Sequence, residues 1–191
     1  MRTSEEEFKE NCDKSNRAHE VAKREIYPVL FNSINSKLVT IECTTNTGDI
    51  SSLTEARKIR RKVLDCELGV DCIVTALEFF PDLDVQEMKY IVSERFLMYY
   101  WRNIPIRETE FCKLHSMPYM LVGWFDKEKN RFKKWIWIPK PGRVATAIKN
   151  KSIGYVKKEG KNFRTVDIED VKAVCPDYVE GPIVAAVVGA S

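Results

Sequence analysis

The sequence of 191 residues lacks several features that mark particular classes of protein. No stretch reaches the roughly 18 uninterrupted apolar residues of a transmembrane helix. Eight Gly and eight Pro are too few for a collagen-like or a Pro/Gly-rich disordered chain. The opening stretch, MRTSEEEFKENCDKSNR, is acidic and polar, which is the opposite of a signal peptide. We therefore expect a single cytoplasmic domain over residues 1–191, with a core at about 5–140 and a C-terminal extension at about 141–191.

Cysteine and histidine are arranged too sparsely for a recognisable zinc knuckle or Cys/His protease. The two histidines, His19 and His115, lie in separate segments. No CxxC pair occurs among the six cysteines, which are Cys12, Cys43, Cys66, Cys72, Cys112 and Cys175. We expect these cysteines to be reduced thiols, and the spacing supports neither a structural zinc site nor a thiol protease.

Charge is distributed unevenly along the chain, although the net charge is only +3. Residues 127–164 contain thirteen Lys or Arg and two Glu, a net charge of +11, whereas residues 165–191 contain one Lys and five acids, a net charge of −4. Such asymmetry favours a surface that faces a polyanion. A solvated, Lys-rich hairpin is the alternative interpretation.

Hydrophobic patterning predicts an α/β or α+β fold, with helices flanking a central mixed β-sheet. The predicted helices span 4–27, where Pro28 ends or bends the helix, 52–64 and about 143–149. The predicted strands span 38–45, 69–80, 89–98, 119–125 and 131–139, and a strand–helix piece spans 163–174. Ile alternates with Trp135 and Trp137, which indicates a central strand covered on both faces. The apolar tail 181–191 is an edge strand, a contact in a homodimer, or disorder.

Two carboxylates are predicted to meet in the hairpin formed by 69–80 and 89–98. A turn centred at Asp82–Leu83 places Asp71 opposite Glu94, with Cβ atoms about 5 Å apart. Like charges so placed are destabilising unless Arg95, the basic segment or a divalent cation offsets them. Mg²⁺ or Mn²⁺ held there could activate a water and stabilise charge on a phosphate. The alternative is a surface hairpin with acids on its wet face.

Several short stretches resemble the PD-(D/E)XK nucleases, and more narrowly some viral and archaeal members. The matching pieces are GVDCIV around Asp71, then SERF at 93–96, PIRE at 105–108, EFCK at 110–113, Tyr119 and Gly123. The resemblance covers residues 15–140. It implies a restriction-endonuclease-like αβββαβ core, with a metal-binding Asp on the second strand and an acid-x-Lys on the third.

Carried over to this chain, the resemblance makes Asp71 the metal-binding acid. Ser93 stands where the family has Glu or Gln, and Arg95 stands where it has Lys. Glu94 would supply the missing carboxylate if it faces the site, although strand alternation puts it on the opposite face to Ser93 and Arg95. Glu20, in the first helix, matches an accessory acid of some members.

Glu87 and Lys89 are the alternative acid and Lys. The predicted register, however, puts Glu87 opposite Glu78 and far from Asp71. Basic side chains that could hold DNA phosphates are Arg57, Lys58, Arg60, Arg61, Lys62, Arg102 and Arg107. The sequence thus predicts an Mg²⁺-dependent nuclease that hydrolyses DNA, located in the host cytoplasm if the source is a virus. The alternative is an inactive member that binds nucleic acid or protein, in which Ser93 marks the loss of the site.

Overall fold

The computed structural model describes residues 4–44, 54–61, 63–64, 68–81, 84–98, 103–107, 111–148, 154–158 and 161–181. Some sequence predictions lie outside these residues. They are the tail beyond Gly181, Lys62, Arg102, and the side chains of Arg57, Arg60, Arg61 and Arg107.

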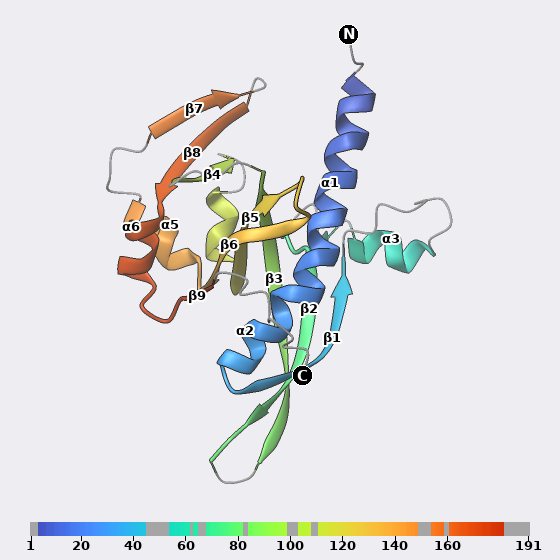
Figure 1. The fold of residues 1–191 in the computed structure, drawn as a ribbon, viewed down its shortest axis with the longest axis vertical. Coiled ribbons are helices and arrows are strands. Elements are labelled where there is room, and N and C mark those ends of the chain that lie inside the picture. The colour runs from blue at the N-terminus through green and yellow to red at the C-terminus, as the bar shows by residue number, and fades with distance from the viewer. Residues whose placement is uncertain are drawn as a thin grey trace, which may run out of the picture.

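A six-stranded mixed sheet forms the centre of an α+β fold (Figure 1). The strand order is β1-β2-β3-β5-β6-β9, and the bounds are β1 Ser36–Cys43, β2 Cys72–Phe79, β3 Val85–Leu97, β5 Tyr119–Asp126, β6 Arg131–Pro139 and β9 Val179–Gly181. Neighbouring strands are antiparallel except β3 and β5, which are parallel. A parallel pair needs a crossover, and here the crossover contains β4 (Asn103–Arg107) and the 3-10 turn η3 (Cys112–His115).

Helices α1 (Ser4–Glu25) and α2 (Tyr27–Ser33) cover one face of this sheet. Ala18, Val21 and Ala22 recur at helical spacing and are buried against the strands. The prediction that Pro28 interrupts the helix is confirmed, because α1 ends at Glu25 and Pro28 lies in the first turn of α2. Proline is tolerated there because the first-turn N–H groups have no partner within the helix. A further short helix, α3 (Glu55–Arg61), follows β1 in the chain.

The opposite face of the sheet is covered by α5 (Gly142–Ile148), α6 (Ile168–Val174) and a second, three-stranded sheet. The order in this sheet is β4-β8-β7, with β7 spanning Gly154–Lys158 and β8 spanning Lys161–Asp167. Asp167 caps α6 by accepting a hydrogen bond from the Glu169 N–H at 2.9 Å. Each face of the central sheet therefore has its own apolar cluster.

Most predicted strands of the central sheet are present, and the α+β class is confirmed. Trp135, Ile136, Trp137 and Ile138 are all buried, which confirms that β6 is covered on both faces. Strands β4, β7 and β9, and with them the second sheet, were not predicted. These strands are short, at five, five and three residues, so alternation has little length in which to show.

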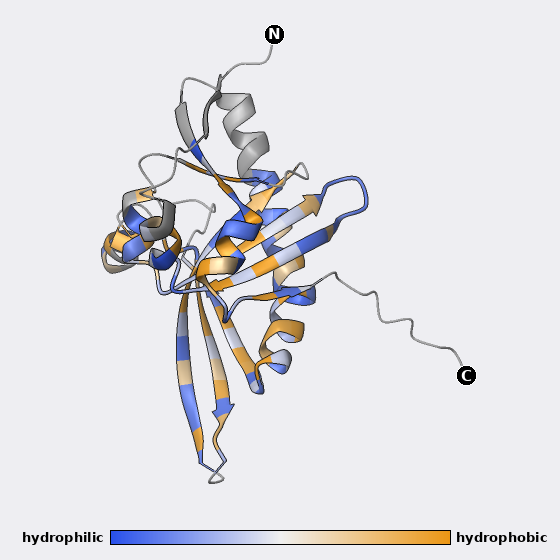
Figure 2. Cartoon of the chain, turned by 90° about the vertical axis from the view of Figure 1, so that its left-hand side faces the viewer, coloured by the Kyte–Doolittle hydropathy of each residue, from blue (hydrophilic) through white to orange (hydrophobic). Residues whose placement is uncertain are grey.

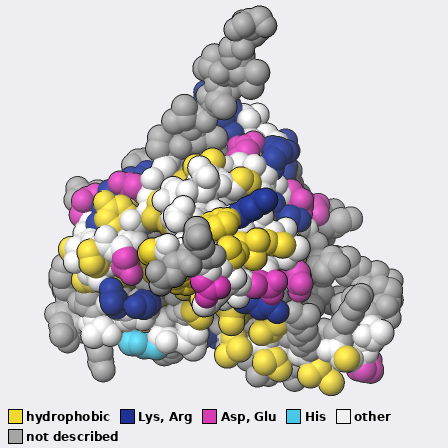
Figure 3. Space-filling model, turned by 90° about the horizontal axis from the view of Figure 1, so that it is seen from below, with side chains coloured by type: hydrophobic (Ala, Val, Ile, Leu, Met, Phe, Trp, Pro, Cys, Tyr) yellow, Lys and Arg dark blue, Asp and Glu magenta, His cyan; other side chains and the backbone are white. Residues whose placement is uncertain are grey.

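The far end of the β2–β3 hairpin extends beyond the rest of the fold (Figure 1). Polar and apolar residues are interspersed along its strands (Figure 2), and Phe79, Phe80, Val85 and Met88 are exposed near its tip. Apolar side chains gather on this end of the molecule (Figure 3). None of the helices that the structure describes combines the length and the apolar character needed to cross a membrane.

Candidate functional site

The register of the β2–β3 hairpin differs by one residue from the predicted register. Cys72 pairs with Val92, so Asp71, the next residue outward, lies opposite Ser93. The prediction that Asp71 lies opposite Glu94 is therefore wrong. Because side chains alternate along a strand, a one-residue shift moves the carboxylate of Glu94 to the other face of the sheet.

The loop of the hairpin explains this shift. The Phe80 N–H donates to the Asp84 carbonyl oxygen at 3.0 Å, which leaves an odd number of residues between these two. A turn centred between Asp82 and Leu83 would require an even number. Loop length fixes the register of a hairpin, and the sequence alone did not specify where the strands separate.

Asp71 is held at the start of β2 by hydrogen bonds from the neighbouring strand. Its Oδ2 atom accepts from the backbone N–H of Glu94 at 2.6 Å and lies 3.4 Å from the Ser93 hydroxyl. By alternation, Arg95 lies on the same face as Ser93, and its guanidinium donates to the Pro105 carbonyl oxygen at 3.3 Å. The structure thus brings Asp71, Ser93 and Arg95 to one face.

These residues do not fit the Mg²⁺ or Mn²⁺ site that the family resemblance implies. Mg²⁺ is usually held by one or two carboxylates together with water and phosphate. The flanking family positions hold a hydroxyl and a guanidinium, those of Ser93 and Arg95. Glu42, paired with Ile73 on β1, lies on the same face, but among the described residues no group of three or more metal-binding side chains includes Asp71. Its Oδ2 atom is already engaged by the backbone.

Glu94 instead lies under helices α1 and α2, where its side chain is only 5% exposed. The Tyr27 hydroxyl donates to Oε1 at 2.5 Å, and the Cys72 thiol lies 3.6 Å from the same oxygen. The Nδ1 atom of His19 donates to Oε2. Burial raises the pKa of the Tyr27 hydroxyl and of the Cys72 thiol, and the nearby charge of Glu94 raises both further.

His19 connects this buried carboxylate to the edge of the sheet. Its Nε2 atom lies 2.6 Å from the Cys43 sulfur at the end of β1. Burial alone would lower the pKa of His19, but its hydrogen bonds to Cys43 and Glu94 and the charge of Glu94 outweigh burial and raise the pKa to about 10. The imidazole is therefore protonated at neutral pH and forms a buried ion pair with Glu94.

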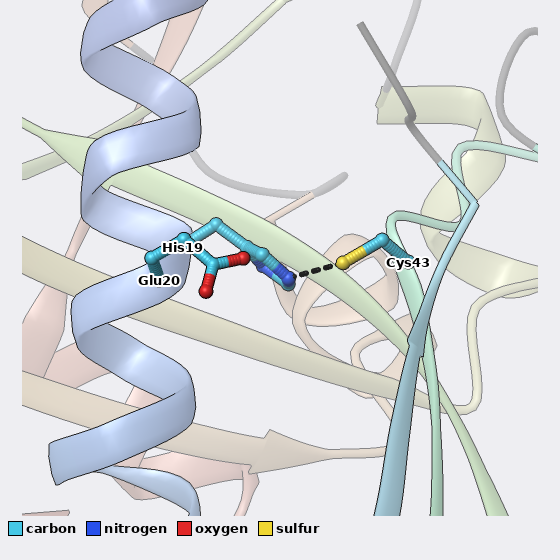
Figure 4. Close-up of side chains that lie close together, drawn as sticks. All are labelled: His19, Glu20 and Cys43. Atoms are coloured by element: carbon cyan, nitrogen blue, oxygen red, sulfur yellow. Dashed lines mark hydrogen bonds between the residues drawn. The ribbon is translucent and has the colours of Figure 1, made fainter. Parts of the chain in front are cut away.

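Glu20 lies next to His19 on α1, and Cys43 faces both from β1 (Figure 4). One donor atom from each of His19, Glu20 and Cys43 lies within 4.8 Å of the other two. Glu20 and Cys43 are exposed, whereas His19 is nearly buried. The Lys23 ammonium binds the Glu20 carboxylate at 3.1 Å. This cluster is the one group of metal-binding side chains found among the described residues.

Glu87 and Lys89, the alternative acid and Lys, are both exposed on β3. The register pairs Glu87 with Leu77 and Lys89 with Thr75. The prediction that Glu87 lies opposite Glu78 is therefore wrong by the same single residue. The structure does not bring Glu87 or Lys89 to the end of the hairpin where Asp71 lies.

A cluster of basic side chains lies at the turn between β5 and β6. Lys127, Lys129, Arg131 and Lys133 are exposed there. They belong to the basic segment 127–164 that the sequence indicated. Of the residues predicted to contact DNA, Lys58 is described on α3, where its ammonium binds Glu55 at 2.8 Å.

His19 and Cys43 were not predicted from the sequence as functional residues. They are 24 residues apart, and His19 is 75 residues from Glu94, so no local spacing connects them. The one available signal was the adjacent pair His19-Glu20 on a predicted helix face, and such a pair is common without any function. Comparison of the chain with family models, with curated proteins and with solved structures found no match.

Proposed function

We propose that this protein binds DNA through the basic turn between β5 and β6, on a scaffold of the PD-(D/E)XK type that does not cut. The observation that carries the proposal is the group of exposed cations at that turn. The order of elements supports the scaffold, since a helical region, three antiparallel strands and a crossover to a parallel strand follow one another as in the αβββαβ core that the resemblance implies. The described part of the crossover holds β4 and the 3-10 turn η3 where that core has an α-helix.

The turn presents its cations in a fixed arrangement. Asp126 accepts hydrogen bonds from the backbone N–H groups of Glu128 and Lys129 at 3.1 Å each, and it binds the Lys133 ammonium at 3.3 Å. The negative charge of Asp126 is therefore compensated by groups within the turn. Arg17 of α1 donates to the Asn130 side-chain oxygen at 2.6 Å, which ties the turn to the long helix.

Lys127, Lys129 and Arg131 remain exposed around this anchored turn. Cations that neutralise phosphates give affinity without sequence specificity, and each contact makes binding more sensitive to salt. A backbone-directed contact of this kind needs no metal. The hydroxyl of Ser93 and the guanidinium of Arg95, at the positions where the family has its acid and its Lys, support binding without hydrolysis.

Fluorescence anisotropy with a short labelled DNA duplex tests the proposal. The charge reversals Lys129→Glu and Arg131→Glu together should weaken binding at least about tenfold and reduce the slope of log K against log salt by about two. The matched control is the pair Arg24→Glu and Lys37→Glu, which reverses two exposed charges elsewhere and should leave the slope unchanged. Equal binding by both double variants, or no binding by the wild type, would overturn the proposal.

Incubation of plasmid and linear DNA with Mg²⁺ or Mn²⁺ tests the second half of the proposal. We expect no cleavage above the level of Asp71→Ala. Cleavage that disappears in Asp71→Ala would overturn binding without hydrolysis and favour the metal-dependent nuclease.

A further inference from the structure

We propose that His19, Glu20 and Cys43 form a Zn²⁺ site at the edge between α1 and β1. The site is separate from the basic turn and does not depend on DNA binding. It draws two side chains from one helix and a third from the end of a strand packed beneath that helix (Figure 4).

The donor set matches the chemistry of zinc. Zn²⁺ is bound in proteins by imidazole nitrogen, thiolate sulfur and carboxylate oxygen, and these are the three donors here. Bond lengths of about 2.0–2.3 Å in a tetrahedron place donors about 3.5 Å apart. The three donor atoms already lie within 4.8 Å of one another, so small side-chain rotations suffice. Three protein ligands and an open position are the arrangement of a catalytic rather than a structural zinc.

Glu94 supplies a carboxylate partner for His19, as the second coordination sphere of a zinc-binding histidine commonly does. Histidine ligands commonly donate their other ring N–H to a carboxylate, which fixes the tautomer and the orientation of the ring. The Nδ1 atom of His19 donates to Glu94 in this way, and Nε2 faces Cys43. On binding, Zn²⁺ would displace the proton from Nε2 and the proton from the Cys43 thiol, and both protons would go to solvent. Glu94 is in turn held by the Tyr27 hydroxyl. Glu94 and Tyr27 therefore hold the His19 ring in this orientation in the absence of an ion.

The cluster is accessible to a cation. The Lys23 ammonium, 3.1 Å from the Glu20 carboxylate, is the cation that Zn²⁺ would displace there. Glu20 and Cys43 are exposed, so an ion can enter from solvent.

Metal titration of the reduced, full-length protein tests the site. Zn²⁺ is titrated against a chromophoric chelator, and Co²⁺ serves as a spectroscopic substitute. We expect one ion per chain, a thiolate-to-Co²⁺ charge-transfer band and the strong d–d absorption of tetrahedral Co²⁺. No binding in competition with the chelator, or octahedral Co²⁺ without the charge-transfer band, would overturn the proposal.

Variants assign the ion to these residues. Cys43→Ser should abolish the charge-transfer band, and Glu20→Gln should weaken Zn²⁺ binding about 10- to 100-fold. Glu25→Gln, on the same helix, is the matched control and should bind as the wild type does. Both test substitutions are at exposed positions, so loss of folding does not confuse the result. Full binding by Cys43→Ser would overturn the site, and full binding by Glu20→Gln would overturn the three-ligand set.

Alkylation distinguishes a zinc ligand from a reactive thiol. Cys43 is labelled with iodoacetamide with and without Zn²⁺, and its peptide is followed by mass spectrometry. We expect Zn²⁺ to protect Cys43 at least about tenfold, since a coordinated thiolate is a poor nucleophile. Equal labelling rates would overturn the proposal and leave a His19-activated thiol as the role of the pair.

Discussion

Asp71 and Glu94 are carboxylates on adjacent strands of one hairpin, and they have opposite environments. Asp71 is half-buried and accepts hydrogen bonds from a backbone N–H and a hydroxyl. Glu94 lies on the other face, under α1 and α2, in an ion pair with His19. The strand pleat alone separates them. Two acids close in register can therefore belong to different sites, and the stability of the protein depends on them unequally.

The largest expected effect is that of Glu94→Ala. The substitution removes the counter-charge of the buried His19 imidazolium and one hydrogen-bond acceptor of the Tyr27 hydroxyl. Removing one member of a buried ion pair destabilises a protein by about 3–5 kcal/mol. The free energy of unfolding, measured with urea and tryptophan fluorescence in the presence of a metal chelator, should fall by that amount. A fall in the free energy of unfolding of less than about 1 kcal/mol would contradict a buried ion pair at Glu94, because exposed ion pairs contribute that little.

Asp71→Ala should have a smaller effect on stability. A hydrogen bond to a charged group contributes about 1.5–3 kcal/mol, and Asp71 is partly accessible to water. The same urea experiment should therefore rank Asp71→Ala below Glu94→Ala. Asp71→Asn, which keeps an acceptor oxygen for the Glu94 N–H, is the matched control and should restore part of the loss. The reverse ranking would contradict the comparison.

Removing one hydroxyl from each face sharpens the same comparison. Tyr27→Phe deletes the 2.5 Å bond to Glu94 and should destabilise the protein by about 1–2 kcal/mol. Ser93→Ala deletes a 3.4 Å contact to Asp71, which is long for a hydrogen bond, and should change stability by about 0.5 kcal/mol. Equal losses of stability in the two variants would indicate that the two hydroxyls contribute equally on the two faces of the sheet.

Glu180 on β9 extends the comparison to an exposed carboxylate and gives the smallest effect. Burial would raise the pKa of Glu180, but hydrogen bonds from Lys172 and Lys134 outweigh it and lower the pKa. A lowered pKa means that the stabilisation is present above the unfolded value of 4.5 and is lost as the pH falls through the folded value. Glu180→Gln should therefore lower stability by about 0.2–1 kcal/mol at neutral pH.

The difference in stability between the wild type and Glu180→Gln should shrink as the pH falls below 4.5, because the stabilisation is lost as the carboxyl becomes protonated in the folded state. Urea unfolding of the two proteins at neutral and acidic pH measures this. A difference that persists at the acidic pH would contradict an electrostatic origin.

Much of the fold was predictable from local pattern. The apolar face of α1 and the alternating Trp and Ile of β6 identified their elements, because helical and strand periodicities are written directly in the sequence. The candidate site was less predictable. Asp71 lies one residue before β2, within the predicted strand 69–80, and its predicted partner was wrong by one residue because the turn at Phe80–Asp84 set the register.

The sequence by itself determined the α+β class, five of the six strands of the central sheet, and the basic segment that begins at the β5–β6 turn. Only the tertiary structure decided that Glu94 points towards α1 and that His19 and Cys43 meet. Periodicity reports which face of an element is apolar, whereas contacts between residues 24 or 75 positions apart depend on how a helix docks and how a hairpin registers. Those depend on packing between elements, for which a single sequence carries no local signal.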